Sequence, residues 1–255
     1  MPNKGATGPI KFESLDSGAP CALTYRLAQT CEEVVEAWRM LYRTYLQANL
    51  INPNRHAIHI VPQATEPGNA VIFGTIGQVL VTTLTAFVDS PQTKLPLDRV
   101  YRPQLDNLRE QGRHLMEVGL FADRRDGIAR SAPALFQLMR YAYYFGLQSQ
   151  VTDFVIGVHP RHARFYIRSF GFDQFGDPTH YPTVNNRLVV LLRGDLEARL
   201  ATRPLDPALQ FFKNHPVPDE AFAHRFAFGP QDIAGSPIEA YLRDYESHQD
   251  LSQTG

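Results

Sequence analysis

The feature that most constrains the fold of this chain is a regular alternation of strand and helix patterns over residues 114–195. An apolar strand comes first, and the helix after it is predicted to begin at a Ser131 cap and to be closed by Gly146. A second apolar strand, a second helix that stops at Gly171 and a final strand complete the series. Helices between strands act as right-handed crossovers, so these strands are predicted to pair in parallel.

The chain before this series is predicted to add antiparallel strands to the same sheet. Two strand patterns rich in β-branched residues flank Gly77, which is typical of a hairpin. An earlier strand and a helix capped by Thr30 precede them, and Trp38 and Leu41 on that helix are expected in the core. We therefore predict an α+β (mixed α/β) fold, with one mixed sheet flanked by helices. The expected ranges are 21–28 and 32–47 for the first strand and helix, 49–68 for a proline-rich loop, and 69–76 and 78–89 for the hairpin strands.

Composition narrows the class of protein. The chain has 255 residues of which 44% are hydrophobic, enough for one large core. Its net charge of −1 provides no whole-molecule field for nucleic acid or an anionic membrane. Cys21 and Cys31 are too few for a disulfide framework or a cysteine zinc site, which favours a reducing cytoplasm. No apolar run reaches the roughly 18 residues that span a bilayer, so no transmembrane segment is expected.

The domain organisation is predicted to be simple. Residues 1–21 are rich in Gly, Pro and Ser, lack the apolar stretch of a signal peptide, and are expected to form a flexible tail. Residues 22–197 form the expected domain. Residues 198–255 show no second core, and we expect an extension that packs on the same domain or trails from it.

A turn between the first strand and the helix of the alternating series is a candidate phosphate site. Backbone N–H groups of a glycine-containing turn and the positive end of the next helix bind phosphate without a particular side chain. Gly127 would let the backbone approach, and Arg124, Arg125 and Arg130 add positive charge. The same pattern is also compatible with a solvated basic turn.

The second helix of the series carries a candidate proton donor. Phe165, Phe170 and Phe172 are expected to fill the core, and Gly171 to form a left-handed helix cap. Tyr166 differs from them, because a tyrosine hydroxyl at the open edge of a sheet can donate a proton to a leaving thiolate.

In their order and separation, these two elements resemble the GCN5-related N-acyltransferase (GNAT) superfamily from about Leu115 to Phe172. The resemblance implies a sheet splayed between strands 118–121 and 154–158, with the pantetheine arm of an acyl thioester in the gap. It assigns Tyr166 as general acid. Pro160 stands where the superfamily frequently has Asn, so the entry to the second helix is expected to differ. The donor-binding residues that it implies are Val118, Gly119, Leu120, Phe121, Arg124, Arg125, Gly127, Ala129, Arg130 and Val158.

A narrower resemblance is to the FeeM-type N-acyl amino acid synthases, relatives of the acyl-homoserine-lactone synthases. It rests on four stretches in order, and the HPRH run that begins at His159 is the most distinctive. The resemblance implies transfer of a long fatty acyl chain from an acyl carrier protein to the amino group of an amino acid. Glu117 matches the strand glutamate of the lactone synthases, but no arginine follows it here. The four stretches are residues 37–54, 114–125, 158–172 and 181–197.

The chemistry of acyl transfer agrees with this outline. An amino acid's ammonium group must lose a proton before it attacks a thioester, and a carboxylate such as Glu117 can accept that proton directly or through water. The alternative is a purely structural role, in which Glu117 is a solvent-facing strand residue paired with Arg109 or Arg113. No covalent enzyme intermediate is required, because the chain has no Gly-x-Ser-x-Gly elbow and its cysteines lie far from the motif.

The donor is expected to be a phosphopantetheine-linked acyl thioester, with no tightly bound cofactor. An acyl carrier protein presents an acidic helix, and arginines spread around the site would complement it better than they would the nucleotide of coenzyme A. This favours the carrier protein. The arginines in question are Arg124, Arg125, Arg130, Arg140, Arg161, Arg164 and Arg168.

On the acceptor side, the loop at 49–68 is expected to shape the pocket, because a carboxylate acceptor needs a cation such as Arg55. Tyr42, Tyr45 and His159 are further candidates. The paired histidines of the chain lack the spacing of a zinc site, and no metal is predicted.

Three functions remain open from the sequence. The first is N-acyl amino acid synthesis from an acyl carrier thioester, with at most a weak membrane association through the product. The second is a GNAT N-acetyltransferase that uses acetyl-coenzyme A. The third is a non-catalytic module that binds an acyl chain or a partner.

Overall fold

The computed structural model describes residues 23–123, 132–202 and 204–252 of the chain. The expected tail therefore lies outside the described residues, as do the residues of the predicted phosphate turn, Arg124, Arg125, Gly127, Ala129, Arg130 and Ser131. The strands are β1 (Leu23–Leu27), β2 (Ala70–Ile76), β3 (Val79–Val88), β4 (Leu115–Asp123), β5 (Asp153–Val158), β6 (Asp173–Gln174), β7 (Thr179–Tyr181) and β8 (Arg187–Asp195). The α-helices are α1 (Cys31–Gln47), α2 (Asp98–Glu110), α3 (Ala132–Gln148), α4 (Pro160–Phe170), α5 (Leu196–Ala201), α6 (Pro207–Asn214), α7 (Pro230–Ile233) and α8 (Pro237–Ser252).

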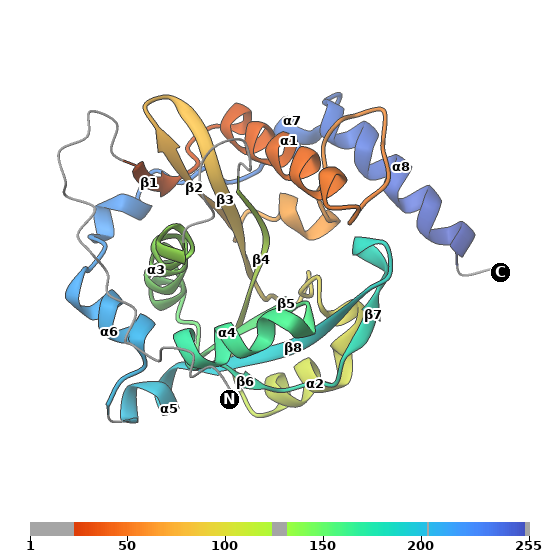
Figure 1. The fold of residues 1–255 in the computed structure, drawn as a ribbon. Helices are drawn as coiled ribbons and strands as arrows, with labels where there is room; N and C mark the ends of the chain where they lie inside the picture. The colour runs from red at the N-terminus through yellow and green to blue at the C-terminus, as the bar shows by residue number, and fades with distance from the viewer. Residues whose placement is uncertain (1–22, 124–131, 203, 253–255) are drawn as a thin grey trace, which may run out of the picture.

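The strands form one mixed sheet in the order β1-β2-β3-β4-β5-β8-β6, with β7 paired to β8 (Figure 1). The predicted hairpin is confirmed: β2 and β3 are antiparallel around Gly77, whose φ of 58° suits glycine. The predicted parallel pairing of β4 with β5 is also confirmed. The mixed α/β fold expected from the alternating patterns is therefore the fold of this chain.

One pairing differs from the prediction, because β8 is antiparallel to β5. The crossover helix α4 leads first to β6 and β7, which are antiparallel to β8 and so run in the direction of β5. The chain then turns back at Asn185 and Asn186, both with positive φ, and β8 inserts between β5 and β6. The crossover rule thus holds for short strands that the sequence analysis did not identify.

Strands β4 and β5 are paired along only part of their length. The paired positions are Leu115 with Asp153, Met116 with Phe154 and Glu117 with Val155, and none follows although β4 continues to Asp123. Beyond this point β4 carries a bulge, where Leu120 adopts a φ of 48° and the register with β3 shifts. A bulge bends the strand that carries it, so β4 turns away from β5. The sheet is therefore splayed between these two strands, as predicted.

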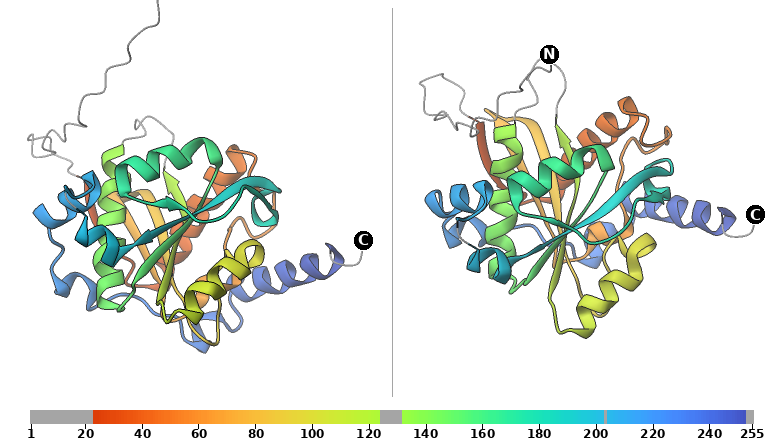
Figure 2. Two further views of the ribbon diagram at one scale, coloured as in Figure 1. Left: turned by 90° about the horizontal axis from the view of Figure 1, so that it is seen from below. Right: turned by 60° about the horizontal axis from the view of Figure 1, so that its bottom comes forward.

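Helices lie on both faces of the sheet (Figure 2), and two hydrophobic clusters of side chains join them to it. The first joins α1 and α2 to side chains such as Leu115 and Val155, and Trp38 and Leu41 are buried in it as predicted. The second joins α3, α4 and α6 to the opposite side of the same strands. The C-terminal residues contribute to both, with Tyr241 of α8 in the first cluster and Phe212 of α6 in the second. No helix of the described residues is long and apolar enough to cross a membrane.

The end of α3 differs from the sequence prediction. Gly146 does not close this helix, which continues through Gln148. A Cβ at Gly146 would lie 2.6 Å from the buried ring of Phe154 on β5, so glycine is needed here for the close approach of helix and strand. Gly171, in contrast, ends α4 with the predicted left-handed conformation (φ 61°).

Candidate active site

Glu117 lies on β4 at the last position that pairs with β5. It is buried, with 5% of its surface exposed, and its Oε2 accepts a hydrogen bond from the backbone N–H of Leu97 at 2.8 Å. The side chain of Leu97 packs against one side of Gly157 on β5, where a Cβ would lie 2.7 Å from its Cδ2. The segment that leads into α2 therefore closes over the carboxyl group at the origin of the splay.

Burial controls the proton affinity of Glu117. Loss of solvation raises its pKa to about 8, the Leu97 N–H opposes the rise, and the charge of Asp98 adds to it. Neither arginine of the alternative interpretation pairs with it. Arg109 binds Asp89, Asp98 and Asp106, and Arg113 binds Asp153, Asp195 and Glu197.

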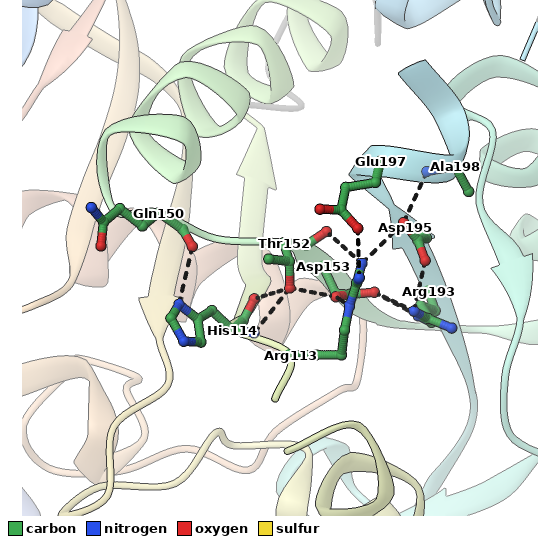
Figure 3. Close-up of polar contacts among 9 residues, drawn as sticks. All are labelled: Arg113, His114, Gln150, Thr152, Asp153, Arg193, Asp195, Glu197 and Ala198. Carbon is green, nitrogen blue, oxygen red and sulfur yellow. Dashed lines mark hydrogen bonds and ion pairs between the residues drawn. The ribbon is translucent and has the colours of Figure 1, made fainter. Parts of the chain in front are cut away.

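An ion-pair network joins the paired ends of β4, β5 and β8 (Figure 3). Its centre is the fully buried Asp153 at the start of β5, which accepts from Arg113 before β4 and from Arg193 on β8 at 2.6 Å. The hydroxyl of Thr152 also accepts from the N–H of His114 at 2.9 Å. Because these contacts hold one end of the strand pair together, the opening between β4 and β5 is confined to the other end.

Exposure of the strands begins where their pairing ends. Gly119, Leu120 and Phe121 are half-buried on β4 after the buried Val118. On β5, Gly157 is exposed and Val158 is half-buried after the buried Ile156. Unpaired strand backbone presents N–H and C=O groups to a ligand. The predicted donor-binding residues of the two strands thus line the open part of the splay, with Val118 at its inner end.

Tyr166 on α4 is held by aromatic neighbours. Its ring stacks on Phe170 at 5.7 Å between centroids and meets Phe165 edge-on at 5.4 Å. Burial raises the pKa of Tyr166 to about 12, so its hydroxyl stays protonated near neutral pH. Among the described residues this hydroxyl has no hydrogen-bond partner, so it can donate its proton to a ligand.

Tyr45 on α1 lies near Tyr166. Burial raises the pKa of Tyr45 and a charge on Tyr166 raises it further, so the two phenols are within electrostatic reach although their helices belong to different clusters. Tyr45 is therefore the predicted acceptor residue whose hydroxyl is electrostatically coupled to that of Tyr166. Among the described residues it shows no hydrogen bond between Tyr166 and Glu117.

The other predicted acceptor residues have structural partners. The hydroxyl of Tyr42 lies 3.4 Å from the N–H of Asn54 and orders the loop after α1. Arg55 is exposed and pairs with Asp244 on α8 at 3.0 Å. His159 caps α4, its Nδ1 accepting from the N–H of Arg161 at 3.2 Å.

The structure describes four of the seven arginines of the predicted basic patch, and Arg124, Arg125 and Arg130 lie outside the described residues. Arg161, Arg164 and Arg168 are exposed and share one face of α4 by their helical spacing. Arg140 does not extend this face, because it donates to the carbonyl of His215 at 3.0 Å.

Sequence reasoning missed two residues around Glu117, namely Leu97 and Tyr181. Tyr181 is buried, donates to the carbonyl of Pro96 at 3.2 Å, and has a raised pKa caused first by burial and then by the charge of Glu117. Pro91 and Pro96 predicted only a loop for the segment that contains Leu97. No local pattern predicted that this segment packs on the sheet.

A family model and a solved structure point to the same family of proteins. The family model described as N-acyl amino acid synthase FeeM matches residues 36–195, more than half of the chain. The solved structure of FeeM, an N-acyl amino acid synthase from uncultured soil microbes, has a TM-score of 0.64 and 25% identity, covering 75% of this chain and 98% of that one. No curated protein matches the sequence significantly.

Two further structures share the fold at lower identity. TofI, solved in a ternary complex with an inhibitor and MTA, has a TM-score of 0.54 and 16% identity, covering 73% of this chain and 98% of that one. BjaI, a CoA-dependent acyl-homoserine lactone synthase solved with SAM and isopentyl-CoA, has a TM-score of 0.52 and 14% identity, covering 79% and 99%.

Proposed function

Because the chain belongs to the N-acyl amino acid synthase FeeM family, and so is an N-acyltransferase, we propose that it moves a long-chain fatty acyl group from an acyl carrier protein to the amino group of an amino acid. The acyl thioester is its substrate, and no tightly bound cofactor takes part. Under this proposal the reaction takes place in the cytoplasm. The protein associates with membranes at most weakly, through its lipid product.

The observation that carries the proposal is the splay between β4 and β5. The strands separate after Glu117 and Val155, and backbone on both sides becomes exposed beyond that point. A pantetheine arm has two amides that need hydrogen-bond partners, and unpaired strand backbone supplies them. The splay thus offers a thioester an extended site that ends at Glu117.

The proposed reaction is direct attack on the thioester. The acceptor's amine forms the C–N bond, the C–S bond breaks, and the electron pair leaves on sulfur. Glu117 accepts the proton of the ammonium group, through water because its carboxyl is buried, and with a pKa of about 8 the carboxylate form that can accept this proton increases as the pH rises toward 8. Tyr166, whose pKa of about 12 keeps it protonated near neutral pH, gives its proton to the leaving thiolate, and the second proton that the attacking nitrogen loses as the amide forms restores the Tyr166 hydroxyl.

A carrier protein is the proposed donor because of the charge on α4. Three exposed arginines, Arg161, Arg164 and Arg168, form a basic face on the helix that carries Tyr166. An acidic partner helix would be attracted to such a face, mainly through its rate of association. The donor-binding role of Arg124, Arg125, Gly127, Ala129 and Arg130 remains part of the proposal on sequence grounds.

Lipid analysis of a producing host tests the proposal. We expect expression of the chain in a bacterium that makes fatty acids to yield a new N-acylated amino acid by mass spectrometry, and the Glu117→Gln, Tyr166→Phe double variant to yield none. An unchanged lipid profile would count against the function.

The donor is then tested with purified protein. Dodecanoyl-carrier protein, dodecanoyl-CoA and acetyl-CoA are compared at equal concentration with a mixture of the common amino acids. We expect the highest kcat/KM with the carrier protein, and a loss of that preference on substituting the α4 arginines with Gln. A preference for acetyl-CoA would establish the acetyltransferase instead.

A further inference from the structure

A small pocket opens beside the segment that covers Glu117. It has a volume of about 250 Å³, and its walls come from the loop after α1 at residues 61–63, the segment before α2, the first turns of α2, the end of β7 with the turn after it, and α8. Pockets for drug-sized ligands measure about 300–1,000 Å³, so this one suits a smaller molecule, such as a single amino acid.

The charge of this pocket is positive. Lys94, Arg99 and Arg102 line it, all three are exposed, and none forms an ion pair with the described side chains of residues 23–123, 133–202 and 204–245. The one carboxylate in the wall, Asp98, is already held by Arg109 at 2.6 Å and by the N–H of Leu95 at 2.8 Å. Three exposed cations on one pocket attract an anion, and guanidinium groups bind a carboxylate in bidentate fashion.

Tyr181 connects the pocket with Glu117. It lines the pocket, and its pKa responds both to the charge of Glu117, which raises it, and to that of Arg99, which lowers it. Asp98, another wall residue, raises the pKa of Glu117. The pocket and the proposed base therefore lie within electrostatic reach of each other.

The pocket also lies on a particular face of the sheet. Leu95 and Tyr181 belong to the cluster that contains α1 and α2, whereas α3 and Tyr166 belong to the cluster on the opposite face. The expected phosphate turn leads into α3. An anion in the pocket is thus separated by the sheet from the helix that is expected to hold the donor's phosphate.

From these observations we infer that the pocket binds the carboxylate of the acceptor amino acid through Arg99 and Arg102, with Lys94 adding charge. The inference rests on the proposed function, because it names the site of the second substrate. With its carboxylate bound to these cations, the acceptor amino acid would have its amino group oriented toward Glu117. The cation that the sequence analysis sought in Arg55 is then supplied by α2.

Kinetics with matched acceptors test the inference. The acceptors are the common L-amino acids and their carboxamides, which keep the amine and side chain but lose the negative charge. The variants are Arg99→Gln, Arg102→Gln and the double variant, with Arg102→Lys as the conservative change. Arg39→Gln is the control, because Arg39 is an exposed arginine on α1 outside the pocket.

We expect each Gln variant to raise the KM for the amino acid about tenfold and to reduce the preference for amino acid over carboxamide by the same factor. The KM for the donor should stay at the wild-type value, and Arg102→Lys should recover part of the loss. An unchanged preference in the double variant would overturn the inference, and so would a rise confined to the donor's KM, which would assign the cations to the donor's phosphate.

Binding measured without a donor separates this inference from the proposed function. Calorimetry with the same amino acids should give binding that the double variant loses and Arg39→Gln keeps. Arg102-dependent binding in a protein that makes no acylated product would support the pocket and refute the function. If the double variant makes product and binds the amino acid as tightly as the wild-type protein does, the function is supported and the pocket is refuted. The pocket is also refuted if the wild-type protein does not bind the amino acid.

Discussion

At the scale of single residues, Glu117 combines burial with a single hydrogen bond from protein. A buried carboxylate usually has several donors or a cation close by, which hold its pKa low. Glu117 has the Leu97 N–H alone among the described residues, and the charge of Asp98 opposes its ionisation. The raised pKa is therefore a property of its position at the splay, and it makes the stability of the fold depend on pH.

The Glu117→Gln variant should remove a pH dependence of stability. The folded protein holds the pKa near 8 and the unfolded chain near 4.5, so folding favours the protonated carboxyl. Its stabilising contribution is complete below pH 4.5 and declines by about 1.4 kcal/mol per pH unit as the pH rises toward 8. Urea denaturation of both proteins at several pH values between 5 and 8 measures this difference, and parallel profiles would contradict the assignment.

The Tyr166→Phe variant should lose activity without losing structure. A positioned proton donor contributes about 10²–10⁴-fold, so we expect kcat to fall about 100-fold while the aromatic stacking and the donor's KM persist. Tyr144→Phe is the control, because its hydroxyl donates to the carbonyl of Phe212 at 3.0 Å on another part of the fold. If thioester turnover by Tyr166→Phe matches that of the control, Tyr166 is not the acid.

At the scale of elements, the close approach of α3 to the sheet determines which residues this helix tolerates. Gly146 sits inside the helix, where Ala would ordinarily add about 1 kcal/mol of stability. Its missing Cβ leaves room for the ring of Phe154 and the methyl of Met116. Packing therefore outweighs helix propensity at this position.

The Gly146→Ala variant should be destabilised by up to about 2 kcal/mol. Overpacking of about 1–3 kcal/mol exceeds the gain in propensity, because the Phe154 ring is buried and cannot move freely. Gly68→Ala is the matched control, since a Cβ added at Gly68 would meet no atom within 4 Å and should change stability little. Denaturation midpoints compare the two, and a stabilised Gly146→Ala protein would show that the strand can move away.

At the scale of the whole molecule, the C-terminal residues complete the core on both faces of the sheet. Phe228 stacks on Trp38 at 5.4 Å between centroids, and Ile238 and Tyr241 of α8 are buried against the loop after α1. The Tyr241 hydroxyl donates to the carbonyl of Ile60 at 3.2 Å. Since Tyr245 of the same helix lines the pocket, α8 contributes to both stability and the proposed acceptor site.

The Tyr241→Ala variant should lower the free energy of unfolding by about 3–5 kcal/mol, as removal of a buried aromatic ring does. Trp38 is the chain's single tryptophan, so its fluorescence during denaturation reports this change directly. Leu147→Ala serves as control, because Leu147 is exposed on α3 and should change stability by less than about 0.5 kcal/mol. Equal stability of the two variants would mean that α8 does not belong to the folding unit.

The accuracy of the sequence predictions depended on the range of the interactions involved. The hairpin around Gly77 and the cap at Gly171 follow from neighbours within a few residues, and both were correct. The prediction that Gly146 ends a helix was wrong, because the role of this glycine depends on the ring of Phe154 on β5. The turn at Asn185 and Asn186 carried a readable signal, since consecutive Asn residues tolerate positive φ, but it was not used.

The sequence by itself determined the alternation of helices and strands, the hairpin, and the positions of Glu117 and Tyr166 on a strand and a helix, because periodicity and turn chemistry act over short distances. Only the tertiary structure decided that β4 and β5 separate after Glu117, that Leu97 covers this carboxyl, and that β8 inserts beside β5. It also gathered Lys94, Arg99 and Arg102 into one pocket with Tyr181. These features depend on contacts between distant segments and on the solvent they exclude, which no local pattern contains.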